Sequence, residues 1–317
     1  SVDSVAGDTS STYYDTSDDS STAISFTSSD GLGGGVSACK WDSSDVAYDT
    51  MSNSCESSSS CDVNLSGEGD KTVYIRCSDV YGNKMSTSQQ VDYTIDATAP
   101  SGLSAGNSSS DWVKDKPSVS VSTPTDGTSG VSEIRYNWDS DNLGADCSGG
   151  TLTSSGADLT GSLSEGSHRL YMCTKDNAGN VSSWDGAYKW DNGNPTVNIS
   201  THALTAYKAS SIPSKVEGVA SDAISGLSSV AISIYNQSLY WSGAAFDSAS
   251  RVWLSVTGTD SWEYSFSPGS DGTFTLRSRS TDSAGNTQES SDVEFIYDTI
   301  LPSITVDESS DVSTDSA

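Results

Sequence analysis

The stretch Asp176-Asn-Ala-Gly-Asn180 decides the fold of this chain, because its pattern D-x-x-G-N occurs twice more, at Asp79–Asn83 and Asp282–Asn286. The motif glycines, at positions 82, 179 and 285, are 97 and 106 residues apart. Self-similarity at a nearly fixed period is the sequence signature of a repeat architecture. We therefore expect tandem modules of about 100 residues each.

Two further elements have fixed places around each motif. A D-x-x-x-P stretch follows it, at residues 96–100, 191–195 and 298–302, and an acidic loop precedes it, beginning at Asp30, Asp126 and Asp222. Because three elements recur three times in one order, we predict modules over residues 1–99, 100–194 and 195–301. Residues 302–317 are expected to be the start of a fourth module or a tail, since Ser303–Val306 resembles Thr196–Ile199. We favour a segment of a longer array over a three-domain protein with ragged ends.

Within each module the apolar residues alternate with polar ones, which is typical of strands that bury one face. The stripes are Val73, Ile75 and Cys77; Ile134, Tyr136 and Trp138; Leu170 and Met172; Val230, Ile232 and Ile234; and Phe274 and Leu276. No window indicates an amphipathic helix, and short strands with Gly, Ser, Asp and Pro turns are typical of a sandwich. The predicted fold class is all-β, with three tandem immunoglobulin-like β-sandwich modules in an elongated array.

The order D-x-x-G-N, strand, D-x-x-x-P resembles the bacterial immunoglobulin-like (Big-type) repeats of large secreted and surface proteins. The resemblance covers essentially the whole chain, and the third module, from Ile212 onward, matches the pattern most closely. It implies an immunoglobulin-like fold and an extracellular, cell-surface setting. It does not imply one activity, because such modules serve as spacers, adhesive tips and enzyme accessories alike.

The composition excludes several functions. The chain has 317 residues, with 43 Asp and Glu against 15 Lys and Arg, for a net charge of −28. A field this negative repels nucleic acid and anionic lipid surfaces, and no apolar run is long enough to insert into a membrane. Only 33% of residues are hydrophobic, yet 8 Trp and 14 Tyr are too many for a disordered chain, so thin β cores are expected.

The six cysteines point to disulfides rather than to metal, because neither C-x-x-C pairs nor histidines at ligand spacing are present. Cys147 and Cys173 are the only cysteines of the second module, so we expect them to pair. The first module allows three connectivities, and the nearest-neighbour choice is Cys39–Cys55 with Cys61–Cys77. The alternation places Cys77 and Cys173 on opposite faces of their strands. Disulfides in Ser-rich β modules indicate an extracellular protein.

The conserved order of the three elements also predicts where carboxylates meet. In an immunoglobulin-type sandwich the acidic loop and the D-x-x-G-N hairpin lie at the end where the chain enters, next to the preceding linker. Carboxylates and turn carbonyls are the oxygen ligands that Ca²⁺ prefers, and turn hydrogen bonding alone is the alternative role for the same residues. The two candidate calcium sites between modules are Asp96 with Asp126 and Asp176, and Asp191 with Asp222 and Asp282.

Catalysis finds little support in the sequence. The two histidines, His168 and His202, are in different modules without a recognisable nucleophile motif, and we expect His168 to face solvent and His202 to be exposed. No catalytic residue and no required cofactor are predicted. We expect a non-enzymatic structural segment of a large extracellular surface protein, such as a stalk, an adhesin extender or a fibre-forming unit. The alternative is a module that binds glycan or a host or partner protein through exposed aromatics and acidic loops. For the structural segment, the expected partners are neighbouring modules of the same or identical chains.

Overall fold

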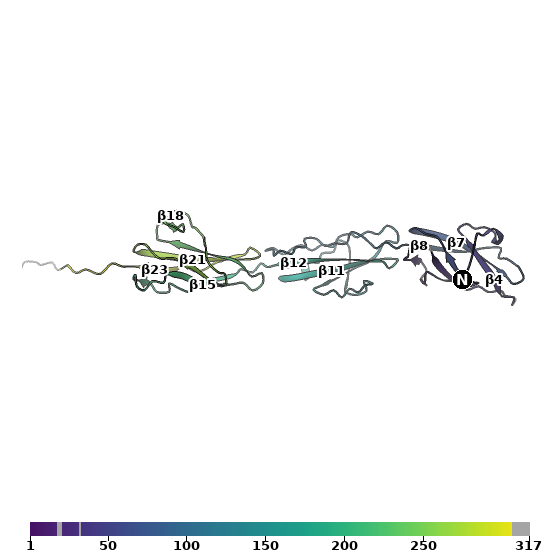
Figure 1. Ribbon diagram of the computed structural model, residues 1–317, viewed down its shortest axis with the longest axis horizontal. Helices are drawn as coiled ribbons and strands as arrows, with labels where there is room; N and C mark the ends of the chain where they lie inside the picture. Colours follow the sequence, from purple (N-terminus) through teal and green to yellow (C-terminus); the bar gives the residue numbers. More distant parts are fainter. Residues whose placement is uncertain (18–20, 32, 306–317) are drawn as a thin grey trace, which may run out of the picture. The chain divides into compact units, whose positions relative to one another are not determined.

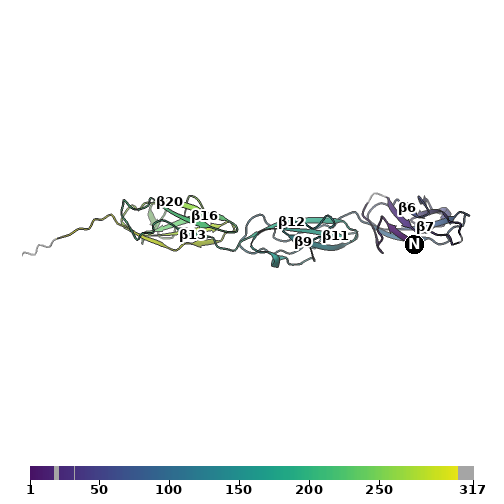
Figure 2. The same ribbon diagram turned by 90° about the horizontal axis from the view of Figure 1, so that it is seen from below.

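A computed structural model describes residues 1–17, 21–31 and 33–305 (Figure 1 and Figure 2). These residues form 23 strands, β1 to β23, and two single-turn 3₁₀ helices, η1 (Tyr48–Thr50) and η2 (Thr160–Ser162), without an α-helix. No helix in these described ranges is long and apolar enough to cross a membrane. The chain divides into two compact units, residues 1–110 with 117–188, and residues 111–116 with the chain from 189 onward. The predicted all-β class is confirmed.

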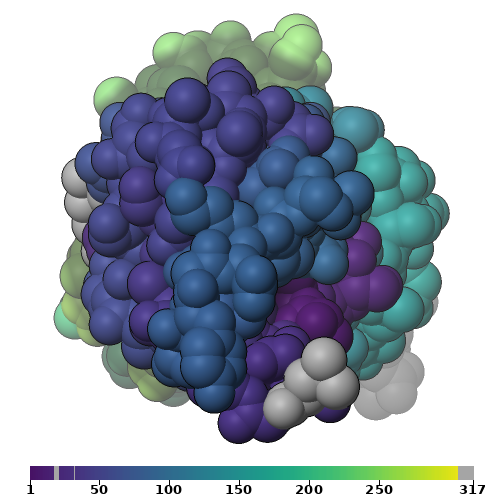
Figure 3. Space-filling model, turned by 90° about the vertical axis from the view of Figure 1, so that its right-hand side faces the viewer, coloured from purple at the N-terminus to yellow at the C-terminus, as the bar shows by residue number. Residues whose placement is uncertain are grey.

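The first unit begins with two sheets that enclose one hydrophobic core. The smaller sheet has the order β1 (Val2–Val5), β3 (Thr22–Phe26), β6 (Ser60–Val63). The larger has the order β2 (Tyr13–Asp15), β8 (Gln89–Ile95), β7 (Gly69–Asp79), β4 (Val36–Asp42), β5 (Asn53–Ser54). In the space-filling view the purple and blue residues of this part of the chain share one surface (Figure 3), as these pairings require.

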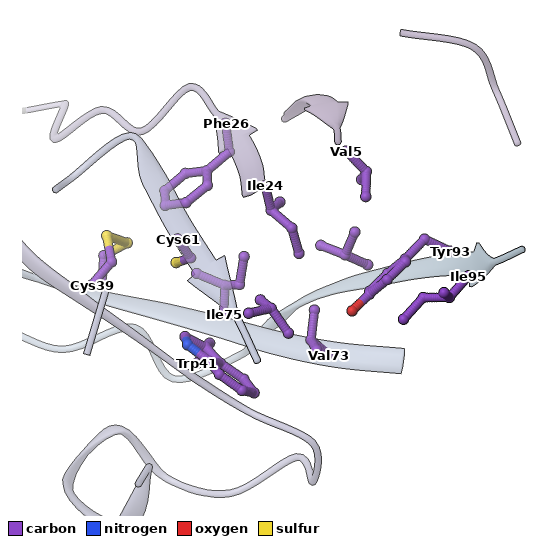
Figure 4. Packing of buried hydrophobic residues seen from close by; sticks show 13 residues of the cluster. Val5, Ile24, Phe26, Cys39, Trp41, Cys61, Val73, Ile75, Tyr93 and Ile95 are labelled. Carbon is purple, nitrogen blue, oxygen red and sulfur yellow. A yellow bond between two sulfur atoms is a disulfide. The ribbon is translucent and has the colours of Figure 1, made fainter. Parts of the chain in front are cut away.

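The alternation of the sequence explains this core. Val73 and Ile75 of β7 are 0% and 2% exposed, and they meet Ile24 and Phe26 of the other sheet (Figure 4). Successive side chains of a strand point to opposite faces, so every second residue enters the space between the sheets. Trp41 of β4, 3% exposed, belongs to the same cluster.

The second half of the first unit contains one regular sheet of four strands, in the order β10 (Thr151–Thr153), β9 (Val131–Trp138), β11 (Gly166–Asp176), β12 (Val181–Trp190), whose last two residues belong to the second unit. In the same unit, residues 101–110 and 117–125 pair only through isolated bridges such as Ala105 with Val121. Val119 and Val121 are nevertheless buried. This segment therefore buries apolar side chains as a sheet does, but it forms few of the backbone hydrogen bonds of a regular sheet.

The second unit again has two sheets around one core. The smaller sheet has the order β13 (Thr196–Ile199), β15 (Lys215–Ser221), β20 (Ser261–Ser265). The larger has the order β14 (Ala206–Tyr207), β23 (Val293–Tyr297), β21 (Gly272–Asp282), β16 (Leu227–Tyr235), β17 (Tyr240–Trp241), β18 (Phe246–Ser248). Two short strands join it at the side, β19 (Leu254–Ser255) on β16 and β22 (Thr287–Glu289) on β21.

One parallel pairing recurs along the chain. Strand β2 pairs in parallel with β8, and β14 pairs in parallel with β23. Val113 forms a parallel bridge with Trp190 in the second unit. The residues after Pro302 form no strand up to Thr305, and Val306, which the sequence placed in the first strand of a fourth module, lies outside the described residues.

The disulfides of the first repeat correct the nearest-neighbour pairing. Cys39 is joined to Cys77 and Cys55 to Cys61. The physical reason is the strand register, which places Cys39 of β4 directly opposite Cys77 of β7. The third disulfide joins Cys147 to Cys173.

The faces of the two strand cysteines differ in the way the alternation indicated. Cys77 shares the core face of β7 with Val73 and Ile75. Cys173 instead packs with Leu143 in a separate small cluster on β11. Its disulfide therefore holds the loop of residues 139–150 against the sheet.

Both histidines are less exposed than the sequence suggested. The His168 side chain is 19% exposed, and its Nδ1 lies 2.7 Å from the Asp139 carboxylate, whose pKa is lowered by this bond in spite of the opposing effect of desolvation. His202 is 2% exposed and packs against Phe295 and Tyr207. The expectation of an exposed His202 is wrong because β14 and β23 close over it.

Candidate metal centres

Each D-x-x-G-N motif folds into a tight hairpin that its first aspartate organises. Asp176 Oδ1 accepts hydrogen bonds from the main-chain N–H groups of Gly179 and Asn180, at 2.6 and 2.8 Å, and Asp176 Oδ2 accepts one from the side-chain amide of Asn180 at 2.9 Å. Gly179 has a φ of 107°, a left-handed conformation that favours glycine. Asp282 and Asn286 repeat the side-chain pairing at 2.8 Å. Local turn chemistry therefore fixes the position of this carboxylate.

The acidic loop places a second carboxylate in the same way. Asp126 Oδ1 accepts hydrogen bonds from the N–H groups of Thr128, Ser129 and Gly130, at 3.1, 2.9 and 2.8 Å. Asp222 Oδ1 accepts the equivalent three bonds from residues 224, 225 and 226. In both loops one carboxylate oxygen serves the turn and the other, Oδ2, accepts no hydrogen bond from a described residue.

The linker aspartate is the third member of each group. Asp96 directly follows β8, its Oδ2 accepts a bond from Ser129 N–H at 3.0 Å, and its main-chain oxygen accepts one from the Asn180 amide at 2.8 Å. Asp191 directly follows β12 and repeats both contacts, with Ser225 N–H at 3.1 Å and with the Asn286 amide at 2.7 Å. The linker is thus bound to both loops of the repeat that follows it.

These contacts gather the carboxylates in the two groups that the sequence predicted. In each group one oxygen per residue lies within 4.8 Å of the others, for Asp96, Asp126, Asp176 and for Asp191, Asp222, Asp282. The linker and motif carboxylates are buried, at 0% or 1% exposed, and the loop carboxylates are half-buried.

Each group concentrates negative charge without a neighbouring basic side chain. None of the six carboxylates forms an ion pair with a Lys, Arg or His of the described chain. Two unit negative charges at the 4.8 Å upper limit of these separations repel each other by about 3.5 kcal/mol at an effective dielectric constant of ~20. Hydrogen bonds from N–H groups offset part of this repulsion, and a bound cation would remove the rest.

The spacing fits calcium. Oxygens that share one Ca²⁺ lie 2.3–2.6 Å from it, so two of them are at most about 5 Å apart. The 4.8 Å limit of both groups meets this condition. Their hard oxygen chemistry, without sulfur or imidazole, also matches Ca²⁺ rather than zinc. The free Oδ2 atoms of Asp126 and Asp222 give each group an oxygen that no turn hydrogen bond uses.

The remaining copies of the three elements are not gathered into such groups. In the first repeat Asp79 forms its hairpin with Asn83, whose side-chain amide bond lowers the pKa of Asp79. The Asp30 loop precedes it, and no linker aspartate joins these two among the described residues. Asp298, the third linker aspartate, is exposed and accepts a bond from Ile300 N–H at 2.9 Å.

The sequence interpretation missed the role of the last motif residue. Asn180 and Asn286 bind a linker carbonyl 84 and 95 residues away. Their constant place after the motif glycine was the available signal. Because asparagine also suits a turn, that place alone did not indicate a distant partner.

The fold and its two aspartate groups define an all-β protein of repeated immunoglobulin-like domains. Residues 182–299 match the family model of the bacterial Ig-like domain, the family that the motifs resemble. None of the curated proteins compared with the chain matches its sequence.

Several solved structures are similar in fold. The fibronectin(III)-like modules of Clostridium thermocellum CbhA are 14% identical, with a TM-score of 0.35, over 60% of this chain and 94% of that one. The tetra-tandem repeat in the extending region of a large adhesion protein is 19% identical, with a TM-score of 0.35, over 88% and 71%. A solved chain from a structural study of host cell surface retention of a 1.5-MDa bacterial ice-binding adhesin is 13% identical, with a TM-score of 0.29, over 88% of this chain and 91% of that chain.

Proposed function

We propose that this chain is a non-enzymatic structural segment of a large extracellular surface protein, composed of three immunoglobulin-like modules over residues 1–99, 100–194 and 195–301. Calcium ions bound at Asp96, Asp126 and Asp176, and at Asp191, Asp222 and Asp282, would fix each linker to the module that follows. Such a segment extends a functional domain away from the surface that carries it, as a stalk, an adhesin extender or a fibre-forming unit. The three disulfides support an oxidising, extracellular location.

The observation that carries this proposal is the equivalence of the two aspartate groups. The same three elements supply the carboxylates, the same N–H groups bind the linker aspartate, and the same asparagine holds its carbonyl. Turn hydrogen bonds alone explain the position of the Oδ1 atoms of Asp126 and Asp222. It does not account for the approach of a buried linker carboxylate to two others, which costs electrostatic free energy in the absence of a cation.

The experiment separates turn chemistry from cation binding. The substitutions Asp126→Asn and Asp222→Asn each keep the side-chain oxygen that accepts the three turn hydrogen bonds. They remove the negative charge and the carboxylate oxygen that no turn hydrogen bond uses. We expect the purified chain to melt several degrees higher with Ca²⁺ than with chelator, since ligand at a hundredfold its Kd stabilises a site by about 2.7 kcal/mol. The variant with both Asp126→Asn and Asp222→Asn should lose this difference. Without calcium it should melt no lower than the natural chain.

Asp30→Asn is the matched control, because it changes the equivalent loop of the first repeat, where no described linker aspartate approaches. It should leave the calcium-dependent shift unchanged. Calorimetric titration should give two sites per chain. Identical melting curves with chelator and with millimolar Ca²⁺, or a shift that survives in the double variant, would sink the calcium proposal.

A further inference from the structure

A polar and aromatic groove lies on the third repeat, away from both aspartate groups. Strand alternation sends Ile232 and Ile234 of β16 into the core and leaves Ser233 and Tyr235 on the other face of the sheet. On the adjacent strand β21, Arg277 is directly opposite Ser233. The cavity over these residues has a volume of about 320 Å³, which is at the lower end of small-ligand sites.

Two tyrosines form one wall of this groove. Tyr235 pairs with Tyr240 across β16 and β17, and their ring centroids are 4.7 Å apart at an interplanar angle of 38°. Both rings are half-buried, so part of each faces the cavity. Aromatic walls of this kind contact the C–H faces of sugar rings, while the phenol hydroxyl remains able to form hydrogen bonds.

Arg251 is a positioned donor at the edge of the groove. Its guanidinium lies 5.8 Å from the Tyr240 ring centroid and 5.5 Å from that of Trp253, and its Nη1 bonds to Glu289 at 3.2 Å. Contacts with two rings and one carboxylate fix the plane of the guanidinium. Since a guanidinium has five N–H donors, several remain for a ligand.

The charges of the groove are balanced, in contrast with the chain as a whole. Arg277 binds Asp292 through two bonds of 2.6 and 2.7 Å, and this pairing lowers the pKa of the Asp292 carboxyl. Gln237 donates to Glu294 at 3.1 Å and also lines the cavity. The cavity lining itself holds two arginines and two carboxylates, and Glu289, just outside the lining, pairs with both arginines, so the groove presents donors and acceptors without excess positive charge.

The floor of the groove contains an unused polar atom. Ser233 is 3% exposed, it lines the cavity, and its hydroxyl has no hydrogen-bond partner. Buried polar groups are nearly always paired in folded proteins. This hydroxyl therefore marks a position where a hydroxyl-rich ligand or a water that it holds would complete the hydrogen bonding.

We propose that this groove binds a neutral glycan. A sugar ring presents an apolar C–H face to the tyrosine wall and vicinal hydroxyls to the Arg251 guanidinium and the carboxylates. Balanced charge disfavours an acidic glycan, for which the −28 net charge adds long-range repulsion. The inference is independent of calcium, because no residue of either aspartate group lines the cavity.

The test uses the whole chain on a printed array of neutral and acidic glycans, followed by calorimetric titration with the neutral oligosaccharide that gives the strongest signal. We expect binding to neutral glycans, and weaker or no binding to uronic-acid polymers. Tyr240→Ala and Arg251→Gln should each weaken the titrated affinity by about tenfold or more, as the loss of an anchor residue does. Circular dichroism and melting curves establish that both variants fold.

Two control variants locate the site. Tyr81→Ala removes a tyrosine that is 80% exposed and should leave the affinity unchanged. Trp184→Ala changes a second cavity, of about 520 Å³, on the second repeat, and should also have no effect. The proposal is wrong if no neutral glycan on the array binds, if acidic glycans bind more tightly, or if Trp184→Ala abolishes binding while Tyr240→Ala does not.

Discussion

The side-chain amide of Asn286 donates a 2.7 Å hydrogen bond to the main-chain oxygen of Asp191, 95 residues earlier in the chain. The same amide donates to Asp282 Oδ2 at 2.8 Å, and Asn286 is 0% exposed. One buried side chain therefore holds both the linker and the motif aspartate.

Asn286→Ala should destabilise the second unit by about 1–3 kcal/mol, because it leaves a buried carbonyl and a buried carboxylate without their donor. Urea unfolding followed by tryptophan fluorescence measures the loss. Asn83→Ala is the matched control, since Asn83 is exposed and bonds only within its own hairpin. An equal loss for both variants would show that the linker contact is unimportant.

The disulfide pairing of the first repeat can be tested by trypsin digestion without reduction. Cleavage after Lys40, Lys71, Arg76 and Lys84 places Cys39 and Cys77 in different peptides, with Cys55 and Cys61 together in a third. The pairing in the structure predicts peptide 1–40 linked to 77–84, and peptide 41–71 with an internal bridge. Either alternative connectivity would instead link all three peptides into one species.

The two bridges should also differ in their stabilising effect. Loop-closure entropy gives about 4 kcal/mol for Cys39–Cys77 and about 2 kcal/mol for Cys55–Cys61, since their separations are 38 and 6 residues. Replacing both cysteines of the longer bridge with serine should therefore lower the urea midpoint more than the same change in the shorter one. The reverse order would contradict the entropic estimate.

The sequence predicted the arrangement of the aspartates because three short motifs, each repeated three times, fixed their order along an immunoglobulin-like sandwich. It could not predict the disulfide pairing, which depends on the register that places Cys39 opposite Cys77. Nor could it predict the burial of His202, because the Phe295 ring that packs against it is 93 residues away in the sequence. Residues 101–110 and 117–125 bury apolar side chains such as Val119 and Val121 but form only isolated bridges, which no alternation pattern reveals.

Gly218 on β15 is a position where the backbone and a tryptophan exclude any side chain. A Cβ there would lie 2.1 Å from the main-chain oxygen of Asn198 and 2.3 Å from the Trp262 ring. Gly218→Ala should destabilise the second unit by about 1–3 kcal/mol, because the added methyl group would have to displace a hydrogen-bonded strand or a buried tryptophan ring. Gly269→Ala, where nothing lies within 4 Å, should be nearly neutral. Comparable melting temperatures for the two variants would contradict this packing.

The buried imidazole of His202 should make stability depend on pH. Its ring centroid is 4.8 Å from that of Phe295, its Nε2 has no hydrogen-bond partner, and burial lowers its pKa below the ordinary value near 6.5. The unfolded chain therefore takes up a proton at a pH where the folded chain does not. The stability that His202 contributes is present above the unfolded pKa and is lost as the pH falls below it, by at most about 1.4 kcal/mol per pH unit.

Melting curves recorded from pH 7.5 to 5.0 in chelator measure this dependence, and carboxylates elsewhere contribute to it as well. The difference between the natural chain and His202→Asn isolates the histidine, because asparagine tolerates the left-handed φ of 61° at this position and does not titrate. We expect the variant to have a smaller slope below pH 6.5 than the natural chain. If the slope is unchanged in His202→Asn, the imidazole is either accessible to protons in the folded state or not buried as described.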